Sequence, residues 1–527
     1  MLHPRLAKYL PLLAAALFLL VSWTPDHYWD EFFYLFSAAA HSPRELVRFE
    51  PHQTLFPNGF FTGKIGHVVL LHLLLGWFGP GRVSLITIQA IYAVMVLAFS
   101  AAAWGLLREL LGRRSASRSA LVLLFLPVTT YLGYKTLSEV PSMLFVTLGC
   151  WSFLRGVRED DPSRRLLLLG LAALGLAAGA LCRVTGMLTF VGLALALYLG
   201  RDPRFSGPVL IRSAGVLALS LSFYLAVLYG LGGSLSQLAG LAYHVASRRG
   251  AGVQRLYALA LTLQMFALVL PWGLRRHPGP AARISVIWLA ATALPCLAVY
   301  EPRYYAPALI PLAVLAAAAI WSAARSWFGM HHRWGSIVVL SALVLANRLV
   351  FAPLMPYEID QARLTAVMQQ LQRTSPGGSY LVPWISDWAF LRVAFPRATT
   401  LLCMSAIPQL RYTAGERWGP MPPSDRWWVG SSRYVGSLAA LEEARPPWYY
   451  IGWTFSPSLL RLRERLEQIG IHWADDPERA GWHDHLAGSW VWRDPSLALT
   501  PLKQQGQYHV FRIQLRGRSR ARPKPGA

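Results

Sequence analysis

The chain has 527 residues, of which 54% are hydrophobic and 14% are Asp, Glu, Lys or Arg. Soluble domains carry charge at about a quarter of their positions, so this composition excludes an ordinary soluble protein and indicates an integral membrane protein. The net charge of +24 would suit nucleic acid. However, most Arg residues of the first two thirds stand in short loops between apolar runs, as the positive-inside rule predicts. We therefore expect membrane lipids and no nucleic acid as partners. The four cysteines show neither metal-ligand spacing nor a disulfide framework.

The first apolar run covers about residues 9–24 and follows two basic residues, Arg5 and Lys8. A secretory signal peptide begins in the same way, and this alternative stays open. A retained first helix is favoured, because the run ends in Trp23-Thr24-Pro25 without a small-residue cleavage site.

About eleven apolar runs are long enough to predict transmembrane helices. They lie near residues 9–24, 83–107, 119–134, 140–154, 166–182, 186–200, 213–230, 256–274, 284–299, 304–322 and 336–353. Eleven spans that start in the cytoplasm place all the Arg-rich loops on the cytoplasmic side. These loops lie within residues 108–118, 155–165, 201–212, 275–283 and 325–333.

The same parity requires that the apolar run Ile65–Phe78 does not cross the membrane. The run is short and is flanked by glycines, so we predict an interfacial or half-inserted helix. The outer face then receives most of the unusual polar residues. They lie in the 25–82 loop, the 135–139 turn, the Arg183 turn, the 231–255 loop, the 300–303 turn and everything after residue 353.

From about Tyr357 the sequence is typical of a soluble protein. Helical stretches near 358–373, 435–444 and 457–469 alternate with β-rich segments at 380–382, 400–402, 448–451 and 508–511. This alternation predicts a small α/β domain. The predicted fold is therefore an α-helical polytopic membrane protein with a C-terminal α/β domain outside the cytoplasm. Its parts are a membrane module at 1–355 (with 25–82 as first outer loop), the α/β domain at 356–515 and a basic disordered tail at 516–527.

Three carboxylates, Asp26, Asp30 and Glu31, follow the first predicted span. Carboxylates at a membrane surface are unfavourable unless they face water, a cation or a substrate. A solvated loop start or a helix N-cap is the simple interpretation. The functional interpretation is a general base that accepts the proton of an attacking hydroxyl, beside a second carboxylate that orients the acceptor or holds a cation.

Two further ionisable residues interrupt apolar sequence on the same predicted face. Glu139 lies between two apolar runs, where a helix N-terminal group ahead of Pro141 is the simple interpretation. Arg183 breaks a strongly apolar stretch and needs an anionic partner. That partner can be an internal carboxylate, a lipid headgroup or a substrate phosphate.

Two outer segments complete the candidate set. In Tyr300-Glu301-Pro302-Arg303-Tyr304, the charged pair can form a salt bridge, or Arg303 can bind a phosphate through its planar guanidinium. The outer loop with His244, Arg248 and Arg249 can close over a donor phosphate or rest on lipid headgroups.

Taken in order, these motifs resemble those of the polytopic GT-C glycosyltransferases. The likeness is strongest to the protein O-mannosyltransferase and lipid A aminoarabinose transferase branch, which is glycosyltransferase family 39-like. It covers roughly residues 1–355 and departs from many members at Phe32 and Phe33, where a basic residue is common. The matching pieces are Asp30-Glu31-Phe32-Phe33-Tyr34, Ser138-Glu139-Val140-Pro141, Leu181-Cys182-Arg183 and Glu301-Pro302-Arg303-Tyr304.

The resemblance implies an inverting transfer of a sugar from a polyprenyl-phosphate donor to an acceptor hydroxyl on the outer face. It implies that Asp30 is the base, that Glu31 and Glu139 position acceptor or donor, and that Arg183 and Arg303 bind the lipid phosphate. Asp26, Glu301, Tyr304, His244, Arg248 and Arg249 are further candidates for substrate binding.

Several points stay open at the level of sequence. A divalent cation is possible, and Asp30, Glu31 and Glu139 would then hold it. The acceptor can be a protein, a lipid or a glycan. A transporter, flippase or polymerase of lipid-linked saccharides is the main alternative, and a non-enzymatic scaffold or sensor is the second. Compact loops and many Arg and Ala residues suggest a bacterial inner membrane, with a cytoplasmic N-terminus and a periplasmic C-terminal domain.

Overall fold

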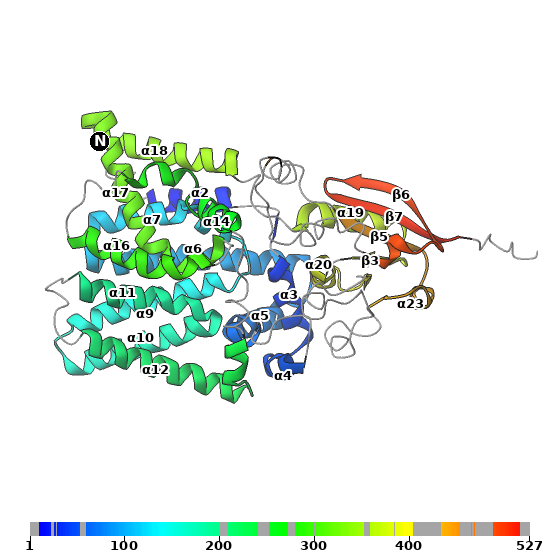
Figure 1. Cartoon of the computed structure of the whole chain (residues 1–527), viewed down its shortest axis with the longest axis horizontal. Helices are drawn as coiled ribbons and strands as arrows, with labels where there is room; N and C mark the ends of the chain where they lie inside the picture. The colour runs from blue at the N-terminus through cyan, green and yellow to red at the C-terminus, as the bar shows by residue number, and fades with distance from the viewer. Residues whose placement is uncertain are drawn as a thin grey trace, which may run out of the picture.

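The fold is mostly helical, with a helical bundle at one end of the molecule and a β-sheet at the other (Figure 1). The short helices α3 (Trp29–Ala40), α4 (Pro43–Phe49) and α5 (Ile65–Phe78) lie between them. The computed structural model describes residues 10–22, 26–27, 29–52, 60–200, 209–240, 252–271, 280–298, 302–351, 359–383, 385–403, 434–453, 465, 468 and 489–516.

Within these residues, five helical segments are long and apolar enough to cross a membrane. They are α6 (Arg82–Leu111), α9 (Glu139–Arg158), α10 (Pro162–Cys182), α12 (Val209–Gly230) and Pro302–Phe328, which joins a 3-10 turn to α17 (Leu309–Phe328). Shorter bundle helices are α2 (Leu10–Ser22), α7 (Arg113–Phe125), α8 (Pro127–Leu132), α11 (Met187–Leu199), α14 (Gly252–Leu263), α16 (Pro280–Ala293) and α18 (His332–Ala346). The chain is thus an integral membrane protein, and the number of eleven spans stays a prediction.

One predicted span is divided in two. The run 119–134 becomes the end of α7 followed by α8, with Leu126 extended between them at φ −61° and ψ 143°. Pro127 explains the break, because a proline ring disfavours helical backbone in the residue before it. A short non-helical stretch then leads from the end of α8 to the start of α9 at Glu139.

Helix α5 packs against the end of α10 through a glycine. A Cβ atom on Gly66 would lie 2.8 Å from Leu181 Cβ and 2.9 Å from the Leu181 carbonyl carbon. The backbone of α10 cannot yield as a flexible side chain can. The contact therefore fixes α5 beside the turn that carries Arg183.

This contact predicts opposite effects for two substitutions in one helix. We expect Gly66→Ala to lower the free energy of unfolding by about 1–3 kcal/mol, because the new methyl group overpacks a rigid contact. Gly76, near the other end of α5, has nothing within 4 Å of its virtual Cβ. Gly76→Ala should raise stability by about 0.5–1 kcal/mol through helix propensity alone. Unfolding in mixed detergent measures both, and equal signs would contradict this packing.

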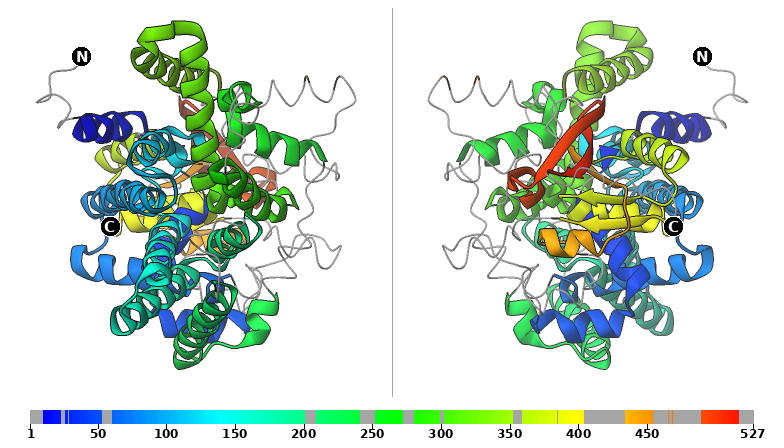
Figure 2. Two further views of the ribbon diagram at one scale, coloured as in Figure 1. Left: turned by 90° about the vertical axis from the view of Figure 1, so that its left-hand side faces the viewer. Right: turned by 90° about the vertical axis from the view of Figure 1, so that its right-hand side faces the viewer.

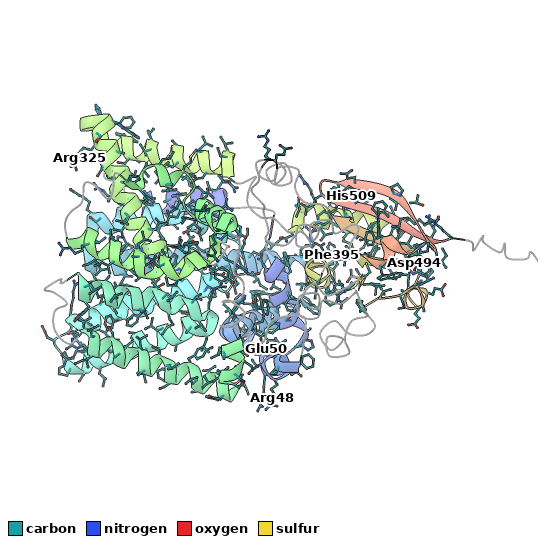
Figure 3. The ribbon with its side chains drawn as sticks, viewed as in Figure 1. Arg48, Glu50, Arg325, Phe395, Asp494 and His509 are labelled. Carbon is teal, nitrogen blue, oxygen red and sulfur yellow. The ribbon has the colours of Figure 1, made fainter. Side chains whose placement is uncertain are left out.

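The buried carboxylate of Glu50 holds the loop that leads into α5. It accepts hydrogen bonds from the backbone N–H groups of Phe61 and Thr62 and from the Thr62 hydroxyl. The Gln237 amide donates to the same carboxylate from 3.3 Å. Glu50 lies in the middle layer of the molecule, whereas Arg325 lies at the end of the bundle far from the sheet (Figure 3). The carboxylate thus sets where the turn Thr62–Lys64 begins.

The sheet at the other end has five strands in the order β4-β3-β5-β7-β6. Strand β3 pairs parallel with β4 and β5, and β7 pairs antiparallel with β5 and β6. The four β-rich segments expected from the sequence are all strands, and β6 was not expected. The bounds are β3 (Ser379–Val382), β4 (Thr399–Leu402), β5 (Trp448–Trp453), β6 (Leu497–Gln505) and β7 (Tyr508–Leu515), with helices α19 (Gln361–Thr374), α20 (Ile385–Ala394), α23 (Leu438–Glu442) and α26 (Trp490–Arg493).

The two faces of this sheet have different partners. Tyr380, Val382 and Tyr508 point into the same hydrophobic core that runs through the helical bundle. Leu381, which lies between Tyr380 and Val382 in β3, and Tyr450 of β5 point into a second, smaller core. One face therefore packs toward the bundle. In the right-hand view of Figure 2 the sheet lies in front of the helices. The proposed division of the chain at residues 355 and 356 stays a prediction.

Three contacts join the sheet end to the start of the chain. Strand β1 (Asp26–His27) pairs antiparallel with β2 (Ile359–Asp360), with Asp26 opposite Asp360. Helix α20 packs on α3, with Phe390 at 4.8 Å from Phe32 and Trp388 at 4.5 Å from Phe36 between ring centroids. In addition, the Gln89 amide of α6 donates to Gln361 of α19 over 3.3 Å. Helix α3 is thus held by segments more than 300 residues away in the sequence.

Candidate functional site

One buried carboxylate lies between two buried guanidinium groups where three helical segments meet. Glu139 Oε1 lies 2.7 Å from Arg183 Nη1 and 3.6 Å from Arg303 Nε. Side-chain exposure is 0% for Glu139, 7% for Arg183 and 3% for Arg303. Charges so well removed from water need partners, and each of these three finds one here. We call these three residues the Glu139 cluster.

The local sequence explains why Arg183 points into this cluster. Helix α10 ends at Cys182, and Arg183 leaves it with extended backbone at φ −163° and ψ 115°. Its carbonyl accepts a hydrogen bond from the Ser142 hydroxyl of α9 over 3.3 Å. A Cβ atom on Gly186 would lie 2.2 Å from that same hydroxyl oxygen. The turn after α10 therefore packs directly on α9, whose first residue is Glu139.

Further polar and aromatic contacts fix the orientation of Arg183. Its Nε donates to the Thr185 hydroxyl over 3.1 Å, and its Nη1 donates to the Ser138 hydroxyl over 3.3 Å. Tyr304 stacks on it, with 4.5 Å from the guanidinium carbon to the ring centroid. Arg303 lies 5.6 Å from the same ring. Both cations thus share a carboxylate and an aromatic face.

Glu31, the second residue of the Asp30-Glu31 pair, is an anchor in this structure. Glu31 is fully buried, and its carboxylate accepts from the Thr136 N–H over 2.6 Å and from the Thr136 hydroxyl over 2.8 Å. Thr136 lies in the turn that leads to Glu139. The bonds join the start of α3 to the Glu139 cluster, while a catalytic role for Glu31 stays a prediction.

The structure adds a lysine that the sequence reasoning missed. Lys64 contacts the Tyr34 hydroxyl, and its ammonium group lies 4.7 Å from the Tyr34 ring centroid and 4.5 Å from that of Phe60. The two rings stack at 5.0 Å. Lys64 also favours the charged form of the Glu139 carboxylate, with a smaller electrostatic effect than that of Arg183 or Arg303. In the sequence, the signal for Lys64 is that it is a single basic residue just before an apolar run on the predicted outer face.

His67 lies one turn beyond Lys64 and is fully buried. Burial, and then the nearby Lys64 charge, lower the pKa of His67 to about 3. The Tyr92 hydroxyl lies 3.0 Å from its Nδ1. The imidazole is therefore neutral at physiological pH and contributes no charge to the site.

The lowered pKa of His67 predicts how stability depends on pH. In the unfolded chain His67 takes up a proton below about pH 6.5, whereas in the folded chain it does so only near pH 3. Stability should therefore fall as pH drops below about 6.5, with a slope of up to about 1.4 kcal/mol per pH unit from this group. Unfolding at several pH values should show a flatter dependence for His67→Gln than for wild type. Parallel curves would exclude this origin.

The structure does not describe the side chains of the remaining predicted site residues. Asp26 pairs through its backbone in β1, and Asp30 is the second residue of α3, but their side chains lie outside the described residues. The residues Glu301, His244, Arg248 and Arg249, and the tail after Arg516, lie outside them as well. The structure thus brings together Glu31, Glu139, Arg183, Arg303 and Tyr304 from the predicted set.

A metal site was one open expectation for Asp30, Glu31 and Glu139. Among the described residues, no group of three His, Cys, Asp or Glu side chains is arranged to hold a metal ion. Because the Asp30 side chain lies outside the described residues, a cation held by Asp30, Glu31 and Glu139 stays a prediction. Glu31 is bound by Thr136 and Glu139 by two arginines, and guanidinium groups suit an anion rather than a cation.

Comparisons with known proteins point to one kind of fold. Residues 70–229 match the model of a family described as dolichyl-phosphate-mannose-protein mannosyltransferase. No curated protein sequence matches significantly. The structure is similar to ArnT from Cupriavidus metallidurans bound to undecaprenyl phosphate, with a TM-score of 0.55 and 13% identity over 97% of this chain and 98% of ArnT. For ArnT in the apo state the TM-score is 0.54, with 13% identity over 96% and 97%.

A further similar structure is the archaeal oligosaccharyltransferase AglB from Archaeoglobus fulgidus, in complex with an inhibitory peptide and a dolichol-phosphate. Its TM-score is 0.47, with 12% identity over 84% of this chain and 69% of AglB. At such identities a structural likeness shows the fold alone. Together with the family match over 70–229, the likeness to ArnT confirms the predicted resemblance to GT-C glycosyltransferases.

Proposed function

We propose that this GT-C-like membrane protein transfers a sugar from a polyprenyl-phosphate donor to an acceptor hydroxyl, with inversion at the anomeric carbon. The Glu139 cluster is the observation that carries the proposal. Its two guanidinium groups lie at ends of membrane-length helices, and we propose that the phosphate of a membrane-bound lipid binds at this level. The match to a mannosyltransferase family over 70–229 supports the same reaction class.

The leaving group determines what the cations do. When the bond between the anomeric carbon and the phosphate oxygen breaks, polyprenyl phosphate departs and negative charge grows on that oxygen. Fixed positive groups lower such a barrier because they need no reorganisation. Arg183 and Arg303 are held by Glu139, and Arg183 is also held by Thr185 and by the Tyr304 ring. They are our candidates for phosphate binding.

The acceptor side requires a base. We propose that Asp30 accepts the proton of the acceptor hydroxyl as its oxygen bonds to the anomeric carbon. Asp30 stands in the first turn of α3, where a carboxylate is favoured by the helix dipole. Its neighbour Glu31 is bound to Thr136 and so suits an anchoring role better. Proton transfer by a positioned side chain contributes about 10²–10⁴-fold to rate.

We also propose that the site faces the outer side of a bacterial inner membrane, with a cytoplasmic N-terminus and the sheet in the periplasm. The Arg-rich loops support this orientation. The sheet end lies beside α3 and can hold or screen the acceptor there. Asp26, His244, Arg248, Arg249 and Glu301 are proposed to complete the substrate site.

The test is release of free polyprenyl phosphate by the purified full-length protein in detergent. Short-chain polyprenyl-phosphate sugars that differ in the sugar are supplied, each with a mixture of protein, lipid and glycan acceptors. Nucleotide sugars of the same series are the matched control. We expect release from one lipid-phosphate sugar and no consumption of any nucleotide sugar.

Consumption of a nucleotide sugar would contradict the proposed donor class. If no donor is consumed, binding of the same lipid-phosphate sugars to the protein is measured. Saturable binding without release, together with transport of the lipid across vesicle membranes, would replace the transferase with the transporter, flippase or polymerase alternative.

A further inference from the structure

A buried tyrosine at the start of strand β7 is hydrogen-bonded to the segment that pairs with the first outer loop. Tyr508 begins β7 and is 0% exposed. Its hydroxyl accepts from the backbone N–H of Asp360 over 3.2 Å and donates to Asp387 Oδ1, 3.5 Å away. Asp387 lies in the first turn of α20 and is also buried. One hydroxyl thus connects β7, β2 and α20.

Among the described strands, β1 pairs with β2 alone, and each of these two strands has only two residues. Asp360 is opposite Asp26, and Ile359 is opposite His27. A two-stranded ladder of this length has little stability of its own. It persists because its β2 side is fixed, and the Tyr508 hydroxyl fixes it at Asp360. The Asp360 side chain also caps α19 by accepting from the Arg363 N–H over 2.8 Å.

The other end of the same connection lies on α3. Helix α20, which carries Asp387, packs on α3 through Phe390 and Trp388. Strand β1 is separated from α3 by one residue. Through Asp360 of β2, the Tyr508 hydroxyl is therefore connected to β1, the strand just before α3. Through Asp387 it is connected to α20, the helix that packs on α3. Both set where the first turn of α3, and with it Asp30, lies.

We propose that Tyr508 is a positioning residue for the first outer loop, acting through Asp360 on β1 and through Asp387 on α20. The inference rests on the proposed function, because it assigns the sheet end a part in the same reaction. Under it, the C-terminal sheet is a support for the catalytic loop and not merely a cover over the acceptor. Displacement of a reacting group by 1 Å can lower a rate by about a hundredfold, so loss of one hydroxyl should be visible in kcat.

The test compares Tyr508→Phe with Tyr380→Phe in the full-length protein. Tyr380 is a matched control. It is 1% exposed, lies in the same sheet, and its hydroxyl donates to the Ser375 carbonyl over 2.7 Å. That bond has no link to β1 or α3. We expect Tyr508→Phe to lower kcat for polyprenyl phosphate release by about tenfold, within the range set by small displacements. The KM for the donor should be unchanged, and Tyr380→Phe should retain the kcat of wild type.

A second measurement does not depend on activity. Amide hydrogen exchange of residues 359–363 should become faster in Tyr508→Phe, because the Asp360 N–H loses its acceptor, and should not change in Tyr380→Phe. Equal exchange in both variants would overturn the proposal, and so would faster exchange with an unchanged kcat. If wild type releases no polyprenyl phosphate, the proposed function fails, while the exchange result still decides whether Tyr508 holds β2.

A rescue distinguishes positioning from a general loss of structure. The pair His27→Cys and Ile359→Cys stand opposite each other in the ladder, at a cross-strand separation that a disulfide can bridge. In the Tyr508→Phe background, oxidation of this pair should restore kcat and reduction should remove the gain. A kcat that stays low in the oxidised protein would place the defect elsewhere and overturn the proposal.

Discussion

Asp30→Asn should reduce polyprenyl phosphate release by at least about a hundredfold, the effect expected when a general base is lost. The substitution keeps the size of the side chain and removes its ability to accept a full proton. Because the proposed phosphate ligands lie elsewhere, on Arg183 and Arg303, binding of the lipid donor should change little. Release is measured at saturating donor, and donor affinity is measured separately by titration.

The control for Asp30→Asn is Glu45→Gln, in the same loop that is predicted to lie on the outer face. Glu45 is exposed and caps α4 through Ser42, and glutamine can serve the same cap. Release should therefore be retained in this variant. An Asp30→Asn protein with wild-type release would remove Asp30 from the role of base and direct the search to Asp26 and Glu139.

Glu139→Gln should lower the free energy of unfolding by about 3–5 kcal/mol, the usual effect of breaking a buried ion pair from one side. The variant leaves two buried guanidinium groups facing a neutral amide. Donor affinity should fall as well, since Arg183 and Arg303 lose the carboxylate that orients them. Unfolding in mixed detergent gives the first quantity, and titration with polyprenyl phosphate gives the second.

Glu109→Gln is the matched control for this effect. Glu109 of α6 lies 2.9 Å from Arg158 Nη1 of α9, but the two side chains are 28% and 27% exposed. A pair in contact with water should contribute only about 0–1 kcal/mol. If both glutamine variants lose equal stability, then burial does not strengthen the Glu139 cluster.

A second substitution separates the effect of unpaired charge on stability from the effect of altered packing. Replacing Arg183 by Met in the Glu139→Gln background removes one of the two cations and fills its place with an apolar chain. Buried ion pairs are often replaced by apolar residues at little loss of stability. We expect the double variant to regain part of the stability, and a loss that is simply additive would argue against direct coupling.

The proposed chemistry fits the position of the site in the fold. A polyprenyl phosphate stays in the bilayer, so its enzyme must bind it where headgroups meet water. The Glu139 cluster lies at the start of α9, just past the end of α10 and at the start of the Pro302–Phe328 segment. These are the helix ends nearest α3 and α5. The sheet lies beyond that layer and holds α3 from the other side (Figure 1).

The sequence by itself determined the class of the protein, because composition and apolar run length report directly on a membrane environment. It also singled out Glu139, Arg183 and Arg303 as candidates, since ionisable groups at the ends of apolar runs are unfavourable without a partner, while Tyr304 entered as part of the motif that resembles the GT-C family. The β-rich segments of the last third, such as Tyr380–Val382, could be read from local propensity. The division of the run 119–134 follows from Pro127, a local signal within an otherwise apolar run.

Only the tertiary structure decided which partner each charge has. That Arg183 and Arg303 share Glu139, and that Glu31 binds Thr136 across 105 positions, depends on how distant helices pack. The same holds for Lys64 and Tyr508, whose contacts form between segments far apart in the chain. A side chain's type limits what it can bind, whereas the packing of α3, α5, α9 and α10 determines which group stands within reach. Local sequence carries no record of such long-range distances.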